Sequence, residues 1–261
     1  AALQHLADET VRDCVDVPAL QAFLLARFDE AARARYGELL TLPLMIQFQS
    51  ARQRLCKTAE IQARIRTDGW RIDRVEWPFE LALSGLTVRG TIDRVDRRVD
   101  DPTCVRVLDY KTSDTPATAP EAHLRSARDD DADRPAWQRV RIDGKERVWT
   151  DLQLPLYRRA MAAEFGEKVQ CGYINLPKAA GDAALEVWEA LTPDLQASAE
   201  RCAEGAAAAI VAGEFWPPAE VDRDRDDWAE LFHQGCADSI DAGCVAGLSA
   251  RTAGTNPGGA P

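Results

Sequence analysis

The hydrophobic pattern of the chain changes its period at Trp70, and this change constrains the fold more than any other feature. Before Trp70, in LQHLADETVRDCVDVPALQAFLLARFDEAARARYG, apolar residues recur at helical spacing. After it, RIDRVEWPFELAL and LTVRGTIDRVDRR alternate between apolar and polar residues, as half-buried strands do. The sequence therefore predicts a helical part over residues 1–69, followed by a sheet.

Proline, glycine and aspartate divide these two parts into elements. Pro18 lies where a second helix is expected to open, because proline is tolerated in the first turn. A third helix is expected over about residues 43–68. Beyond it we expect three antiparallel strands, with turns at residues 84–85 and 100–102.

The second half of the chain alternates between ordered and low-complexity segments. Residues 113–149 are rich in Pro, Ala and acidic residues, which predicts a long loop or a partly disordered segment. A capping box of Thr150 and Gln153 predicts the next helix. VQCGYINLP predicts a further strand, and an alanine-rich helix is expected to end at Gly213. The tail over residues 249–261 is expected to be flexible.

Charge is unevenly distributed along the chain. The net charge is −11, which by itself argues against a nucleic-acid partner. Basic residues nevertheless concentrate between residues 52 and 74 and between 89 and 98, whereas acid concentrates in RDDDADR and EVDRDRDDWAE. Each arginine taken singly is best explained as solvated charge. For an active-site groove, however, the sign of the charge nearby matters more than the net charge of the whole chain.

Cysteine usage and hydropathy bear on the compartment. The seven cysteines are scattered and form no CxxC pair, which favours free thiols in a reducing cytoplasm. No histidine lies at zinc-ligand spacing from a cysteine. The sequence contains no apolar run of about 18 residues and no signal peptide, so we expect a cytoplasmic protein without a membrane partner.

The expected hairpin GTIDRVDRRVDDPTCVRVLDYKTSD carries charges where apolar residues are usual. Strand alternation puts Asp109 and Lys111 on one face, and pairing of the two strands can place Asp93 opposite Asp109. Two carboxylates that face each other repel. A divalent cation between them would make the arrangement tolerable, and a lysine on the same face could position a water molecule or stabilise a phosphate.

Surface salt bridges are a simpler interpretation of these charges. In it, Asp93 pairs with Arg94 or Arg89, and Asp109 pairs with Lys111. For any single residue this interpretation is the better one. It weakens for the whole set, because the strand of Asp109 carries two valines on the same face and so runs from a buried interior into a polar pocket.

Three motifs in this order resemble the PD-(D/E)xK nuclease superfamily: GTIDRVD, then VLDYKTSD, then QLPLYRRAM. The chain looks most like the RecB-like branch, which comprises nuclease domains of bacterial helicase–nuclease repair proteins and related exonucleases. The resemblance covers residues 70–176 well. AGEFWPP is also similar to a C-terminal segment of that branch.

The resemblance implies a role for each residue that matches a motif. It implies that Asp93 and Asp109 bind a metal ion and that the backbone carbonyl of Tyr110 is a further ligand. It implies that Lys111 is the catalytic lysine, and that Mg²⁺ or Mn²⁺ is the cofactor.

The helix that follows carries the third motif. Gln153 and Tyr157 match QxxxY, and their i,i+4 spacing puts both side chains on one helix face, towards the site or the DNA. A packed tyrosine beside a helix cap is the alternative explanation. Arg94 and Asp96 of the DRVD run are expected to support the site rather than to react.

The sequence departs from the RecB-like pattern in two places. A G…H motif, whose His completes the metal site, would lie just before Ala1, which suggests a fragment of a longer protein that binds metal weakly and cleaves poorly. His5 is the available substitute, about one turn too late. Cys202, Cys236 and Cys244 lack the clustering of iron–sulfur ligands, so no cluster is expected.

The expected function is metal-dependent hydrolysis of DNA, in the manner of an exonuclease of DNA repair or recombination. A bound metal would lower the pKa of a water molecule, and affinity for DNA would come from the arginine-rich segments and fall with salt. One alternative is a degenerate nuclease fold that grips DNA or braces a helicase-like region. Another is an unrelated enzyme for a small anionic substrate, which a closed pocket would favour.

The expected fold is α/β with a restriction-endonuclease-like core, a central mixed sheet flanked by helices. The helix of Gln153 should pack across this sheet, and VQCGYINL should join it in parallel. We expect one nuclease-like domain over residues 1–248, with its core at 70–177 and a C-terminal helical part at 178–248.

Overall fold

The computed structural model describes residues 2–116, 118–129, 131 and 134–214. The elements that precede the sheet are the 3-10 helix η1 (Ala2–Ala7), α1 (Val17–Tyr36) and α2 (Leu42–Thr67). Then follow β1 (Trp70–Leu83), β2 (Leu86–Arg98), β3 (Val105–Lys111), α3 (Ala119–His123), β4 (Leu124–Ser126), η3 (Ala136–Gln138), β5 (Arg139–Ile142) and β6 (Lys145–Trp149). The last are α4 (Gln153–Phe165), β7 (Val169–Asn175), η4 (Ala180–Asp182), β8 (Ala184–Val187) and α5 (Pro193–Ala212).

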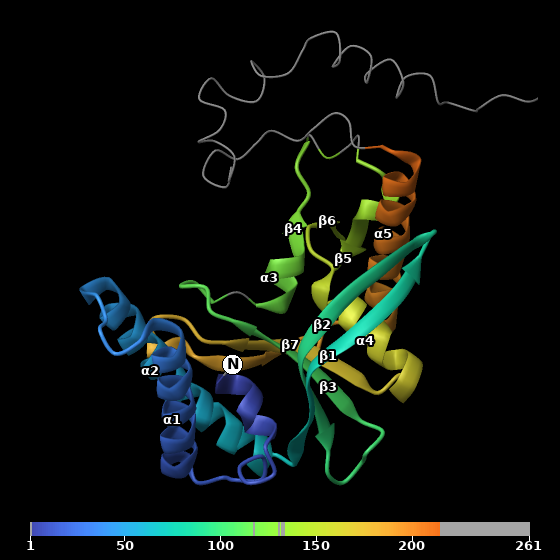
Figure 1. Cartoon of the computed structure of the whole chain (residues 1–261). Helices are drawn as coiled ribbons and strands as arrows, with labels where there is room; N and C mark the ends of the chain where they lie inside the picture. Colours follow the sequence, from blue (N-terminus) through green and yellow to red (C-terminus); the bar gives the residue numbers. More distant parts are fainter. Residues whose placement is uncertain (1, 117, 130, 132–133, 215–261) are drawn as a thin grey trace, which may run out of the picture.

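The strands form two sheets. The central sheet has the order β1-β2-β3-β7-β8, and a smaller sheet with the order β4-β6-β5 lies next to α5 (Figure 1). Strand β3 pairs with β7 in parallel, whereas the other neighbours in the central sheet are antiparallel. The predicted α/β fold with a central mixed sheet is therefore confirmed.

The N-terminal half follows the sequence pattern closely. Pro18 lies in the first turn of α1, and α2 covers nearly the predicted range. The predicted turns join β1 to β2 and β2 to β3. At the first of them, Ser84 and Gly85 both have positive φ, 43° and 89°, which a two-residue hairpin turn of this type requires.

The prediction of a long loop over residues 113–149 is wrong. Helix α3 and strands β4, β5 and β6 lie in this segment. The β5–β6 hairpin turns at Asp143 and Gly144, both with positive φ, 49° and 76°. The prediction from composition failed because a few apolar residues are enough to attach this segment to the main core. Trp149 is the main one, is 2% exposed and packs in that core.

The predicted capping box of Thr150 and Gln153 is also wrong. Helix α4 begins at Gln153, and Thr150 lies outside it, with its Oγ1 3.5 Å from the carbonyl oxygen of Ala122. Asp151 instead accepts a hydrogen bond from the backbone N of Gln153, at 2.6 Å from Oδ1. The side chain of Gln153 is therefore free for contacts other than a cap.

The C-terminal part contains one strand that was not expected. Strand β8 pairs with β7 inside the segment predicted to be helical. Helix α5 is the predicted alanine-rich helix and ends at Gly213, whose φ is 75°. Most of AGEFWPP, the cysteines at 236 and 244 and the tail over residues 249–261 lie outside the described residues.

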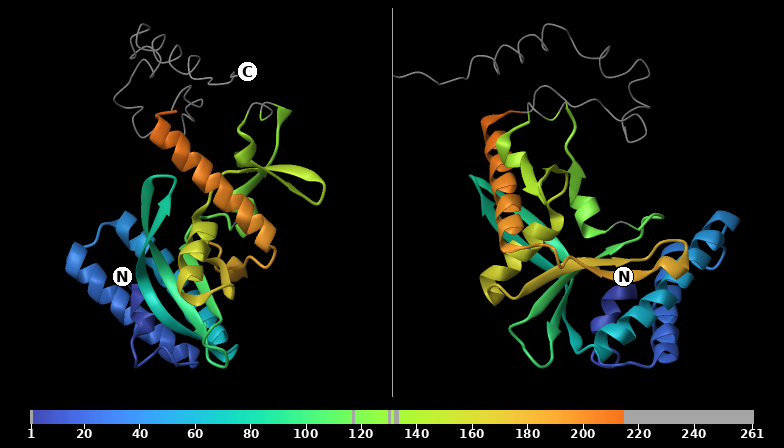
Figure 2. Two further views of the ribbon diagram at one scale, coloured as in Figure 1. Left: turned by 90° about the vertical axis from the view of Figure 1, so that its right-hand side faces the viewer. Right: turned by 180° about the vertical axis from the view of Figure 1, so that it is seen from behind.

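Helices cover both faces of the central sheet (Figures 1 and 2). Helix α4 covers one face, where Met161 shares the main core with Val107. Helix α2 covers the opposite face, where Ile65 shares a core cluster with Leu108 and Ile174. Neighbouring residues of β3 thus point to opposite covered faces, which explains why β3 and β7 are buried along most of their length.

Strands β1 and β2 continue past the central sheet as a long two-stranded arm that reaches α5 (Figure 1). On the arm, the Phe79 ring meets the Tyr157 ring of α4 edge-on, with centroids 5.5 Å apart. Glycine at position 90 is required for this packing, because a Cβ there would lie 2.6 Å from the Phe79 ring.

Three buried charges join β2 to β3 on the face covered by α2. Arg94 donates two hydrogen bonds to the carboxylate of Asp96, at 2.7 and 3.1 Å, and Arg106 donates a third at 3.2 Å. Burial alone would lower the pKa of Arg94, but Asp96 raises it, so the guanidinium stays charged. Arg94 and Asp96 therefore brace the strands from behind the face that carries Asp109.

We predict that Asp96→Ala lowers the free energy of unfolding by about 3–5 kcal/mol, because it leaves two buried guanidinium groups without their anion. Urea denaturation measures this loss. Asp100→Ala is the matched control, since it removes the exposed partner of Arg98 and should cost a small fraction of that value. Equal losses for both variants would contradict the prediction.

Candidate active site

The divergence of β2 from β3 creates the place for a site. Their ladder ends at the pair Arg94–Leu108, although β3 continues to Lys111. Beyond that pair, the backbone N of Tyr110 donates to Oδ2 of Asp93 at 3.0 Å, so a side chain replaces a strand partner. Asp93 is thereby held against the end of β3.

A backbone irregularity on β1 lies across from Asp93. Glu76 has a φ of 48°, which is rare for a residue other than glycine, and it falls between the paired residues Val75 and Trp77. The register of β1 against β2 also shifts nearby, between Ile72 and Arg74, and a bulge of this kind bends a strand and increases its twist. Both irregularities of β1 lie close to the point where β2 leaves β3.

Predicted site residues from β3 and α4 meet at the carboxyl end of β3. Nζ of Lys111 lies 2.8 Å from Oδ2 of Asp109 and donates to Oε1 of Gln153 at 2.7 Å. Nε2 of Gln153 donates to Oδ1 of Asp109 at 2.9 Å and lies 3.1 Å from the hydroxyl of Tyr157. That hydroxyl donates to the carbonyl of Thr91 at 3.0 Å. We call these four side chains, without Thr91, the β3–α4 network.

The amide of Gln153 can satisfy this network in one orientation only. Its oxygen must accept from the ammonium of Lys111, which has no acceptor, and its nitrogen must donate to the carboxylate of Asp109, which when ionised has no donor. A flipped amide would set two donors against each other. The lysine and the carboxylate are thus fixed relative to each other by one side chain from α4.

The charge of Asp109 is poorly accommodated by the protein alone. Its side chain is buried, with 5% of the residue exposed. Burial raises the pKa of Asp109, and the charge of Asp93 adds to the rise, although the hydrogen bond from Lys111 acts in the opposite direction. The net direction is upward, so the ionised carboxylate would gain from a further positive charge nearby.

The family model of the PD-(D/E)XK nuclease superfamily matches residues 1–243. The chain belongs to this superfamily. Among solved structures, a candidate exonuclease from Eubacterium rectale is similar, with 14% sequence identity and a TM-score of 0.38. That match covers 75% of this chain and 66% of the Eubacterium rectale protein. No curated protein sequence matches the chain. Among the described helices, none is long and apolar enough to cross a membrane.

The donor set of this superfamily member suits a hard divalent cation. Asp93 and Asp109 offer carboxylate oxygens, and because burial and the charge of Asp93 raise the pKa of Asp109, a nearby cation would favour its ionised form. Within the described part of the chain, no three His, Cys, Asp or Glu side chains gather closely enough to hold a metal ion. Water or substrate oxygens would complete the coordination, as Mg²⁺ commonly allows.

His5 does not join the two carboxylates. Its Nδ1 lies 3.3 Å from Oδ2 of Asp8, and its side chain is 44% exposed beside η1. The salt-bridge interpretation also fails for Asp93, since Arg94 pairs with Asp96 and Arg89 pairs with Glu80. It holds for the contact between Asp109 and Lys111 described above.

Three residues that the sequence did not single out border the network. Asp151 holds the backbone N of Gln153, and its charge further raises the pKa of Asp109. The ring of Tyr173 lies under Lys111, with Nζ 4.8 Å from the ring centroid, a cation–π distance. His123 lies behind Tyr173 and contacts the start of α4.

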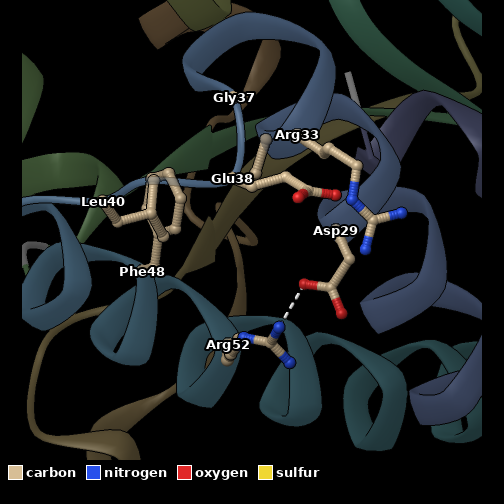
Figure 3. A pocket seen from close by; sticks show the side chains of 8 residues that line it. Asp29, Arg33, Gly37, Glu38, Leu40, Phe48 and Arg52 are labelled. Atoms are coloured by element: carbon tan, nitrogen blue, oxygen red, sulfur yellow. Dashed lines mark hydrogen bonds and ion pairs between the residues drawn. The ribbon is translucent and has the colours of Figure 1, made fainter.

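A separate depression of about 290 Å³ lies between α1 and α2 (Figure 3). Asp29, Arg33, Glu38 and Arg52 line it, and Arg52 donates to Asp29. Opposite charges thus face each other across its mouth. No predicted site residue lines it, so it belongs to the helical pair rather than to the β3–α4 network.

We predict that Asp109→Asn raises the melting temperature of the metal-free protein. The folded state raises the pKa of Asp109 above its unfolded value, so ionisation at neutral pH opposes folding, and a neutral amide avoids this cost. The gain should shrink as the pH falls through the pKa of Asp109, because the wild type then becomes neutral too. Thermal denaturation in EDTA measures the effect.

Asp114→Asn is the control for this prediction. Asp114 is exposed and pairs with Arg54 and Lys178, so its loss should lower the melting temperature or leave it unchanged. Addition of Mn²⁺ should then raise the melting temperature of the wild type more than that of Asp109→Asn. A lower melting temperature for metal-free Asp109→Asn would contradict the prediction.

Proposed function

We propose that the chain is a metal-dependent deoxyribonuclease that hydrolyses phosphodiester bonds. The observation that supports this most strongly is the β3–α4 network, which joins Asp109, Lys111 and Gln153 at the end of β3 in a member of a nuclease superfamily. In its finer form, the proposal is a RecB-like exonuclease of DNA repair or recombination. It would work in the cytoplasm beside a helicase-like region or subunit.

Asp93 and Asp109 are the proposed ligands of Mg²⁺ or Mn²⁺, with the backbone carbonyl of Tyr110 as a further proposed ligand. When bound, the ion supplies an acidified water molecule and neutralises charge on the phosphate. The hydrogen bond from the backbone N of Tyr110 holds one oxygen of Asp93 in place. The ligand from β2 is thereby tied to the strand that carries the ligand from β3.

Lys111 is the proposed catalytic lysine. Its ammonium lies within hydrogen-bond distance of the Asp109 carboxylate, so it can donate to an oxygen bound at the same place, either of the attacking water or of the phosphate. Gln153 and the ring of Tyr173 keep the lysine there. Tyr157 acts one step further back, since its hydroxyl holds the amide of Gln153.

DNA is the proposed partner, and its affinity should fall as salt rises. Several arginines of the basic segments are already paired, since Arg66 and Arg71 share Asp13, and Arg97 pairs with Asp73. Asp13 thereby links Arg66 of α2 to Arg71 of β1, whereas the pair of Arg97 and Asp73 links β2 to β1. The contribution of these arginines to DNA binding is therefore smaller than the sequence composition implies.

We predict that Lys111→Ala and Asp109→Ala each lower the rate of cleavage of linear DNA with Mn²⁺ by about 10²–10³-fold, because the first removes the ammonium that would donate to the reacting oxygen and the second removes a proposed metal ligand. Lys145→Ala is the control and should cut at the wild-type rate, since Lys145 is exposed at the β5–β6 turn. Cleavage by Lys111→Ala at the wild-type rate would rule out the mechanism.

The competing function is an inactive nuclease fold that grips DNA or braces a helicase-like region. It draws support from the two-carboxylate site, because no third ligand side chain joins Asp93 and Asp109 among the residues described. Calorimetric titration separates the two functions. We predict that Mn²⁺ binds the wild type and that Asp93→Ala abolishes this binding. Binding of DNA without any binding of Mn²⁺ would favour the brace.

A further inference from the structure

A buried histidine lies one layer behind the β3–α4 network. His123 is the last residue of α3, and its side chain is fully buried. The rings of Tyr173 and Trp188 enclose it, with centroids 5.9 and 4.9 Å away. A histidine in such a place must satisfy its ring nitrogens within the protein.

Both ring nitrogens of His123 have backbone partners. Nδ1 lies 2.8 Å from the carbonyl oxygen of Ala119, which can only accept, so Nδ1 carries the hydrogen. Nε2 lies 3.2 Å from the backbone N of Leu154, which can only donate, so Nε2 is an acceptor. These contacts assign the neutral tautomer. Burial also lowers the pKa of His123, which favours the same neutral form.

The backbone of His123 also contacts the segment just before α4, whose first turn its ring contacts. Its carbonyl oxygen accepts from the backbone N of Thr150 at 2.9 Å and lies 3.4 Å from that of Asp151. The approach to α4 and its first turn are thus attached to one residue of α3. Helix α4 has no side-chain hydrogen bond from its own N-cap residue, Leu152, and the first N–H groups of a helix need acceptors.

We propose that His123 is a positioning residue for Gln153, because its imidazole caps the first turn of α4 from outside the helix and so fixes the amide that joins Lys111 to Asp109. This inference rests on the proposed function of the network. The capped N–H belongs to Leu154, the neighbour of Gln153, so a shift of this peptide moves the amide directly. The amide makes two contacts shorter than 3.0 Å, and a small shift breaks them.

Substitutions at position 123 separate this role from simple core filling. His123→Phe keeps the ring and its volume but removes the acceptor. His123→Gln can present an amide oxygen near the position of Nε2. A residue that only fills space would tolerate phenylalanine at least as well as glutamine, whereas a capping residue requires the acceptor.

The first test is NMR spectroscopy of the full chain without metal or DNA. In His123→Phe, the side-chain amide signals of Gln153 should move to the positions of a free amide. The backbone amide of Leu154 should exchange about tenfold faster, as expected for one lost hydrogen bond. His123→Gln should retain most of both wild-type properties. If His123→Phe fails to fold by circular dichroism, His123→Asn replaces it, since it can donate to Ala119 but lacks the distal acceptor.

The second test is kinetic. With Mn²⁺ and linear DNA, His123→Phe should lower kcat and leave KM for DNA unchanged. In a Gln153→Ala background it should have no further effect, because the residue through which it acts is gone. Unchanged Gln153 signals in His123→Phe, or fully additive losses of kcat, would overturn the proposal. An inactive wild type would refute the proposed function alone, since the NMR test needs no cleavage.

Discussion

The parallel pairing of β3 with β7 is the constraint on which the candidate site depends. It keeps β3 paired as far as Lys111, while the antiparallel partner β2 leaves β3 beyond the pair Arg94–Leu108, on the side of Asp93. Space for polar side chains beside β3 opens where its neighbour β2 leaves it while its other neighbour, β7, remains paired. The crossover between β3 and β7 carries α4, so the same connection brings Gln153 over this space. The connection from β3 through α4 to β7 thus sets both the parallel pairing of the two strands and the position of Gln153.

The sequence was sufficient wherever the information is local. The change of period at Trp70, the turn at Ser84-Gly85 and the parallel strand VQCGYINL all agree with the structure. The proximity of Asp109, Lys111, Gln153 and Tyr157 also agrees with the motif spacing, although their roles stay predictions. Alternation in a strand and i,i+4 spacing in a helix depend on neighbouring residues alone, so they can be read without the fold.

The failures concern segments whose structure depends on distant partners. Residues 113–149 have a composition typical of loops, yet Trp149 reaches the main core and stabilises a small sheet. Two local signals were present: Asp143-Gly144 between the runs RVRI and KERVW is typical of a hairpin, and Thr118 with Glu121 forms a capping box at α3. The importance of His123 had no local signal, because its partner on α4 lies 31 residues away in sequence.

The buried cluster of Arg94, Asp96 and Arg106 has a consequence for specificity. A slip of β2 against β3 by one residue would turn Arg94 and Asp96 towards the apolar core under α4 and would leave the buried Arg106 without its anion. Such a misaligned state is penalised far more strongly than a slip between purely apolar strands. The cluster thus favours the observed register of β2 against β3. In this register, the carboxylate of Asp93 lies level with the end of β3.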